Sequence, residues 1–178
     1  ESPEGVVSSS TASPDPRFGD LAPYAAQTSV SVLSSSLNLN KAVNKSVSLS
    51  NSSDLFSVQS LSTSTKLQND SSRTFLTEYN GANRTMTSTS AEGRKAIQVL
   101  NNKSQIVKTQ IGTLEPQVFA YDSRGRIILS TQGPRQTSFS YDNFSNLKSI
   151  KDPLGRTSKF SFDQVGRVLS QTDPSNHK

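Results

Sequence analysis

Apolar and polar residues alternate along most of the chain. In segments 137–142 and 158–163, aromatic residues take every second position and Ser or Thr fills most of the spaces. A two-residue period of this kind predicts β-strands with one half-buried face. Residues 28–67 show the same texture, with Val and Leu separated by Ser, Thr and Asn, which predicts three to four further strands. No segment predicts a convincing helix, and 20–27 is the only weak helical candidate.

Short polar segments interrupt the strands. In the segment from Asp122 to Arg126, the aspartate can bond the backbone two residues on, and Gly125 can take positive φ at no steric cost. Pro153 marks another break, because proline cannot donate to a β-ladder. One period of the sequence therefore comprises two short strands and two turns.

These units recur at a nearly constant spacing. Units start at residues 79, 100, 121, 141 and 162, which are 21, 21, 20 and 21 residues apart. Such a period predicts one supersecondary unit stacked several times, each unit using its neighbours to bury its apolar face. An ordinary β-sandwich with coincidental turns is the alternative, and it would not hold this spacing. The residues that define the repeat motif are Tyr121, Asp122, Gly125, Arg126, Tyr141, Asp142, Asp152, Pro153, Gly155, Arg156, Phe162, Asp163, Gly166 and Arg167.

Two structural expectations follow from the repeat. Strand alternation predicts that the aromatic residues of 119–121, 139–141 and 160–162 lie on one common face. The arginine of each Gly-Arg pair is expected to cross to the aspartate or carbonyls of the next repeat and so to align successive hairpins.

The motifs resemble the YD repeats of the Rhs family. Segment 121–126 (Tyr-Asp-x-x-Gly-Arg) and segment 152–157 (Asp-Pro-Leu-Gly-Arg-Thr) are similar to the two halves of that repeat, closely over 73–178 and more loosely over 15–72. In the family, such repeats form a β-sheet strip that spirals into a hollow shell. Shells of this kind enclose a C-terminal toxin in bacterial Rhs proteins and in the BC component of Tc toxins, and they belong to an adhesion receptor in teneurins. Five periods are too few for a closed shell, so the resemblance implies a segment of a larger one.

The predicted fold is therefore all-β, with stacked antiparallel hairpins forming a curved, spiralling repeat sheet. Composition agrees, since a chain with 31% hydrophobic residues supports a thin core better than a thick two-layer one. We expect a Ser- and Pro-containing lead-in at 1–27, a Ser/Thr-rich β region at 28–72 and the repeat hairpins at 73–178. The composition of residues 1–14 is typical of disorder, so their order would require sheet pairing or a partner.

Catalytic and metal-binding chemistry is sparse. The chain has no Cys and a single histidine, His177, one residue from its end, which leaves no plausible triad or zinc site. The repeated aspartates sit at turn positions, where bonding the turn backbone is the favoured role. Rhs proteins cleave themselves at two Asp-Pro-x-Gly copies. Here the copy at 173–176 lacks the glycine and follows the one at 152–155 by one ordinary repeat period, so both are expected to be plain turns. We predict a non-enzymatic protein without cofactor or metal.

Charge and hydropathy limit the partners. The net charge of +5 is spread along the chain without an Arg/Lys block, which argues against nucleic-acid binding. No apolar run approaches the roughly 20 residues of a membrane span. Because the first residue is Glu1, we expect a processed or excised piece of a longer protein.

The predicted function is a structural scaffold segment of a secreted or cell-surface Rhs-type protein, and this segment helps to enclose or present a toxin or effector. The resemblance to Rhs proteins implies a bacterial source. The alternative is a cell-surface adhesion or carbohydrate-binding module. The expected partners are further repeats of the parent chain or other copies of it, and then an enclosed toxin domain or a glycan.

Overall fold

The computed structural model describes residues 5–35, 37–68 and 70–177. These residues form fourteen β-strands and one 3₁₀ turn, η1 (Ser71–Arg73), and they include no α-helix. The all-β prediction is confirmed. The strands are β1 (Val6–Asp15), β2 (Gly19–Val32), β3 (Asn38–Leu49), β4 (Val58–Leu67), β5 (Thr74–Asn80), β6 (Thr85–Thr89), β7 (Lys95–Leu100), β8 (Ile106–Ile111), β9 (Gln117–Tyr121), β10 (Ile127–Gln132), β11 (Arg135–Tyr141), β12 (Leu147–Lys151), β13 (Thr157–Phe162) and β14 (Val168–Thr172).

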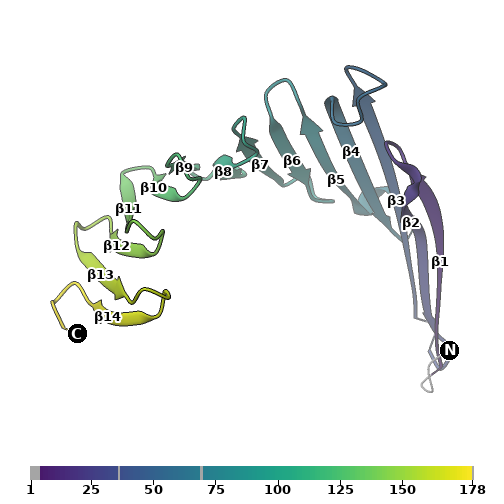
Figure 1. Cartoon of the computed structure of the whole chain (residues 1–178). Helices are drawn as coiled ribbons and strands as arrows, with labels where there is room; N and C mark the ends of the chain where they lie inside the picture. Colours follow the sequence, from purple (N-terminus) through teal and green to yellow (C-terminus); the bar gives the residue numbers. More distant parts are fainter. Residues whose placement is uncertain (1–4, 36, 69, 178) are drawn as a thin grey trace. The chain divides into compact units, whose positions relative to one another are not determined.

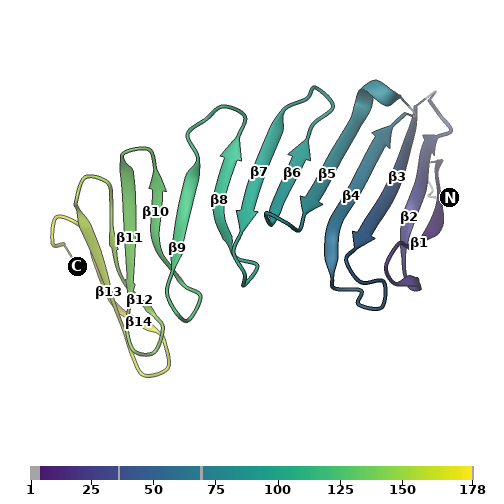
Figure 2. The ribbon, with the colours of Figure 1, turned by 90° about the horizontal axis from the view of Figure 1, so that it is seen from above.

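The chain divides into two compact units between Val99 and Leu100. In the first unit, β1 to β7 lie side by side in chain order, and each strand pairs antiparallel with the next (Figure 1). In the second unit, β8 to β14 follow the same rule (Figure 2). Each unit is therefore a run of consecutive hairpins, which is the arrangement that the sequence repeat predicted.

The amino-terminal region is part of the first sheet. Residues 6–15 form β1 and pair along their length with β2, so sheet pairing accounts for the order of this Ser-rich segment. The segment 20–27 lies inside β2, and its weak helical prediction is wrong. Pairing of Tyr24, Ala25 and Gln27 with β1 supplies backbone hydrogen bonds to this segment, and an isolated helical turn of eight residues that contains Pro23 is unfavourable.

The register of the second unit places its aromatic residues on one face. Phe139 is opposite Ile150, and Ile150 is opposite Ser158, two residues before Phe160. On the other side, Phe119 is opposite Ser130, and Ser130 is opposite Thr137, two residues before Phe139. Because directly paired residues share a face and side chains repeat every two residues, the prediction of a common aromatic face is confirmed.

This face forms a thin core. No apolar side chain among the described residues is fully buried, and the six aromatic rings of β9, β11 and β13 are half-buried. A one-layer sheet has nothing to cover its faces from above, so neighbouring strands provide the burial. In the described part of the chain, no helix is long and apolar enough to cross a membrane.

Candidate functional site

Seven five-residue segments, here called the repeat turns, share one geometry; six of them connect neighbouring strands, and the seventh follows β14. The amide of the first residue donates to the carbonyl of the fifth at 2.9 Å in every one of them, and the amide of the fourth donates back to the carbonyl of the first. The first residue also offers a side-chain acceptor: Asp122 Oδ1 accepts from the amides of Arg124 and Arg126 at 2.9 and 3.0 Å. The repeat turns are 90–94, 101–105, 122–126, 142–146, 152–156, 163–167 and 173–177.

The fourth position of each repeat turn has positive φ. Gly125, Gly155 and Gly166 have φ of 83°, 81° and 83°, which confirms the predicted role of the turn glycine. Ser104 and Ser145 take the same conformation at 60° and 76°, although L-residues are strained there. The geometry of the turn therefore requires positive φ even where glycine is replaced.

The arginine at the fifth position binds its own turn. Arg126 Nε donates to Asp122 Oδ2 at 2.7 Å, and Arg156 and Arg167 do the same to Asp152 and Asp163 at 2.7 Å. The expectation that these arginines cross to the aspartate of the next repeat is wrong. The five-residue loop brings its first and fifth residues opposite each other across the hairpin, so the carboxylate within the turn is the nearer acceptor.

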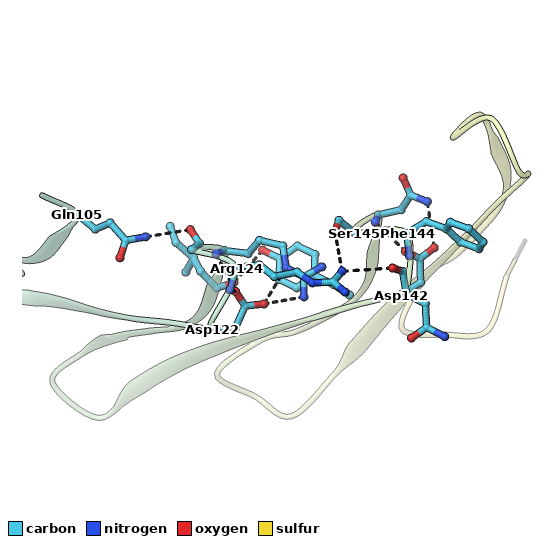
Figure 3. A network of polar contacts seen from close by, with 12 residues as sticks. Gln105, Asp122, Arg124, Asp142, Phe144 and Ser145 are labelled. Carbon is cyan, nitrogen blue, oxygen red and sulfur yellow. Dashed lines mark hydrogen bonds and ion pairs between the residues drawn. The ribbon is translucent and has the colours of Figure 1, made fainter. Parts of the chain in front are cut away.

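Other side chains link one repeat turn to the next in the second unit. Gln105 Nε2 donates to the Gly125 carbonyl at 3.2 Å. Arg124 Nη1 donates to the Asn143 carbonyl at 3.2 Å and to Ser145 Oγ at 3.1 Å. Figure 3 shows these contacts running from Gln105 to the turn of Asp142. These inter-repeat links come from the fifth position of turn 101–105 and from the third position of turn 122–126. The sequence had not singled out either Gln105 or Arg124.

The tyrosine that precedes a repeat turn adds a bond to the neighbouring strand. The Tyr121 hydroxyl donates to the Ile106 carbonyl at 2.7 Å, and the Tyr141 hydroxyl donates to the Ile127 carbonyl at 2.8 Å. The Arg126 guanidinium also lies 4.3 Å from the centre of the Tyr141 ring, within the range of a cation–π contact. Phe162 occupies the equivalent position in the last repeat and has no hydroxyl to donate.

The turn carboxylates are held in the ionised form. The backbone hydrogen bond from Arg126 lowers the pKa of Asp122, with further help from the Arg126 side chain. The pKa of Asp163 is lowered in the same way by the backbone and side chain of Arg167. For Asp142, partial desolvation acts to raise the pKa, but the hydrogen bonds from Asn146 and Phe144 outweigh it and leave the pKa lowered. Carboxylates of this kind accept hydrogen bonds and are poor general acids.

His177 and the two Asp-Pro segments, which the sequence analysis weighed for catalysis and did not favour, belong to repeat turns. His177 Nδ1 lies 3.2 Å from Asp173 Oδ2, in the position that arginine takes in other turns, and its side chain is 81% exposed. Asp152 and Asp173 both accept two backbone amides of their own turns. The described residues also contain no group of three or more His, Cys, Asp or Glu side chains placed to hold a metal ion.

A second polar contact, in the first unit, was not predicted. Asp15 is the only buried residue of the described chain, with 9% of its surface exposed. Its carboxylate accepts from the Arg17 amide at 3.0 Å and from Lys45 Nζ at 3.3 Å. The hydrogen bond from the Arg17 backbone amide lowers the pKa of Asp15. Partial desolvation acts to raise this pKa, but Lys45 lowers it further, and the net shift is downward. Lys45 Nζ lies 4.6 Å from the centre of the Tyr24 ring. The contact joins the β1–β2 turn to β3, thirty residues away in the sequence.

Consecutive hairpins joined by repeat turns define a YD-repeat sheet. The family model described as Teneurin YD-shell matches residues 5–178. The chain therefore belongs to the teneurin YD-shell family.

Solved structures with the same fold agree with this assignment. The chain is similar to a chain in the crystal structure of TcdB2-TccC3-Cdc42, with a TM-score of 0.51 and 15% identity over 96% of this chain. A crystal structure of TcdB2-TccC3 matches with a TM-score of 0.50 and 15% identity, again over 96% of this chain. The chain spans only 10% and 11% of the length of those two chains. No curated protein matches the sequence.

Proposed function

We propose that this chain is a structural wall segment of a YD-repeat shell, which in the intact protein helps to enclose or present a toxin or effector. The observation that carries the proposal is that the recurring polar residues bond to their own turn or to an adjacent strand or turn. Asp122, Arg124 and Tyr141 all make such contacts. Residues committed to cross-linking strands suit a wall better than a reactive site.

The proposed partners are further β-strands. Among the described strands, β1 pairs only with β2, and β14 pairs only with β13, so each has an outer edge that no described strand covers; Val6 is not counted among the open positions of β1. Val168 of β14 is 60% exposed, whereas Ile127 and Leu147, which occupy the same position after the turns of earlier repeats, are half-buried. Leu169 of β14 is 67% exposed, compared with 38% for its counterpart Ile128. More repeats of the parent chain, or a second copy, would cover such an edge.

The proposed setting is a secreted or surface-exposed protein, of bacterial type. Two observations support this setting. The chain belongs to the YD-shell family, and its fold is similar to that of a chain in the TcdB2-TccC3-Cdc42 structure.

The test is protease protection in the full-length natural protein that contains this sequence. If the segment walls an enclosure, an effector-like region of that protein resists added protease at neutral pH. Deleting residues 28–178 should then open the shell, and the same region should be digested at least about tenfold faster, as loss of protective structure implies. Equal digestion rates with and without the segment would contradict the enclosing role.

A further inference from the structure

One face of β4, β5 and β6 in the first unit carries a patch of hydrogen-bonding side chains. Glu78 is directly opposite Ser62 on one side and Thr87 on the other. Two residues on, Asn80 is opposite Ser60 and Thr85. Because paired residues and residues two apart share a face, these six side chains lie together.

Three apolar residues of the same strands lie on the opposite face. Leu61 is opposite Tyr79, and Tyr79 is opposite Met86, so these three alternate with the polar set. The Tyr79 ring is therefore directed away from the polar face.

The polar residues line an open basin of about 370 Å³, which Asn83 of the β5–β6 loop also borders. Leu61 and Tyr79 complete its lining, and because their side chains alternate with the polar set they contribute backbone to this face. This volume is within the usual range for small-ligand sites, although at its lower end. Neither Lys nor Arg lines the basin.

The groups of the basin remain available to a ligand. Among the described residues, the Glu78 carboxylate takes part in no hydrogen bond or ion pair, and the Ser62 and Thr87 hydroxyls make none either. Asn80 uses only its Oδ1, which accepts from the Ala82 amide at 3.0 Å, so its NH₂ group is free. The Thr85 hydroxyl donates to the Asn83 carbonyl at 3.4 Å. The Glu78 carboxylate, the Ser62 and Thr87 hydroxyls and the Asn80 NH₂ group are thus presented together without internal partners.

We propose that this basin binds a neutral saccharide. A carboxylate is acceptor-only, so Glu78 suits two neighbouring hydroxyls of a sugar ring, while the Ser and Thr hydroxyls both donate and accept and the Asn80 amide donates. Glu78 repels acidic sugars, because the basin holds no cation to offset its charge. The proposal goes beyond the wall function and does not depend on it.

The affinity is expected in the millimolar range, since the basin is open and offers no aromatic ring for stacking. Saturation-transfer difference NMR suits such weak binding and also works on large or associated proteins. The probes are maltotetraose, cellotetraose and mannotetraose, with 3′-sialyllactose as the anionic comparison. At least one neutral probe should give saturation transfer to its ring protons, and the anionic probe should give none above background.

Two pairs of variants locate the binding. Glu78→Ala should weaken it about tenfold, as the loss of a charged hydrogen-bonding group implies, whereas Glu115→Ala in the second unit should leave it unchanged. Thr87→Val removes one hydroxyl at nearly constant shape and should also weaken binding, whereas Thr77→Val, on the opposite face of β5, should not. Circular dichroism establishes that each variant keeps its strands.

Three results would overturn the proposal. One is no saturation transfer from any neutral probe at about 20 mM, a concentration about twentyfold above a dissociation constant of about 1 mM. Another is binding that survives both Glu78→Ala and Thr87→Val. The third is a calcium-dependent signal abolished by Glu78→Ala without any sugar effect, which would assign the basin to a cation.

Discussion

Gly125 and Gly166 occupy the same position of two repeat turns, but their surroundings differ. Both have φ of 83°. A Cβ on Gly125 would lie 2.9 Å from Gln105 Nε2, whereas a Cβ on Gly166 would meet nothing nearer than Asn146 Oδ1 at 3.7 Å. The two positions therefore separate the backbone cost of the turn from the cost of disturbing the neighbouring repeat.

Gly166→Ala should lower the free energy of unfolding by about 1–2 kcal/mol, the cost of a left-handed L-residue. Gly125→Ala should cost more, because it also displaces the Gln105 side chain that bonds the Gly125 carbonyl. Urea denaturation of the two variants measures the difference. Equal costs would show that the Gln105 contact contributes nothing to stability.

The tyrosine hydroxyl before a repeat turn can be tested in both directions. Tyr141→Phe removes the bond to the Ile127 carbonyl and should cost about 0.5–1.5 kcal/mol. Phe162→Tyr should gain a similar bond to the Leu147 carbonyl. Leu147 directly follows turn 142–146, just as Ile127, the acceptor for Tyr141, directly follows turn 122–126. Thermal unfolding followed by circular dichroism reports both changes, and a destabilising Phe162→Tyr would contradict the equivalence of the two repeats.

At the scale of the element, the contact between neighbouring hairpins depends on Arg124. Its guanidinium reaches the turn of Asp142 through the Asn143 carbonyl and Ser145 Oγ, while Arg126 stays with Asp122 (Figure 3). The Arg126 guanidinium also lies against the Tyr141 ring, so the third and fifth positions of this turn both contact the next repeat, but only Arg124 donates hydrogen bonds to its turn.

A double-mutant cycle tests this contact. Arg124→Ala and Ser145→Ala should be non-additive, with a coupling of about 0.5 kcal/mol for an exposed pair. The matched cycle combines Arg124→Ala with Ser104→Ala. It should be additive, because Arg124 donates to Asn143 and Ser145 and not to Ser104. Coupling in the second cycle alone would place the inter-repeat link elsewhere.

At the scale of the whole chain, the turn carboxylates make stability depend on pH. Hydrogen bonds to the backbone lower the pKa of Asp122, Asp163 and Asp173, and the net effect is also a lowered pKa for Asp142 and Asp152. A carboxyl with a lowered pKa in the folded state stabilises it above the unfolded value of about 3.9 and loses that contribution as pH falls through the folded value.

The melting temperature should therefore fall as the pH is taken from 5 to about 2. Asp122→Asn keeps an oxygen acceptor for the turn amides but has no titrating group, so the loss on acidification should be smaller than in the unmodified chain. Differential scanning calorimetry across this range measures the two slopes. A melting temperature that rises on acidification would contradict the assigned pKa directions.

The unpaired edges of β1 and β14 predict association of residues 1–178. Light scattering should show a mass that rises with concentration, because each edge offers free backbone groups to another strand. Leu169→Lys places a charge on β14 and should reduce the association, while Leu114→Lys, in the β8–β9 turn, serves as the control. A monomer that is stable on dilution and unfolds cooperatively would show that the sheet caps itself.

Much of the local structure follows from the sequence alone. The 20- to 21-residue period, the two-residue alternation and the Asp-x-x-Gly segments predicted hairpins, turn positions and the shared aromatic face. These features depend on residues a few positions apart, whose geometry is set by strand pleating and by allowed φ values. The arrangement of β9 to β14 could therefore be anticipated before any coordinates.

The tertiary structure alone decided which side chains meet between elements. Arg126 and Arg124 are both cations in one turn, and the sequence suggested Arg126 for the hydrogen bonds to the next turn that Arg124 makes. The pairing of Lys45 with Asp15, thirty residues apart, and the polar basin around Glu78 likewise depend on the register between strands. The physical reason is that such contacts are set by cross-strand register and by the direction in which each turn projects its side chains, and a one-residue shift in pairing would exchange every partner.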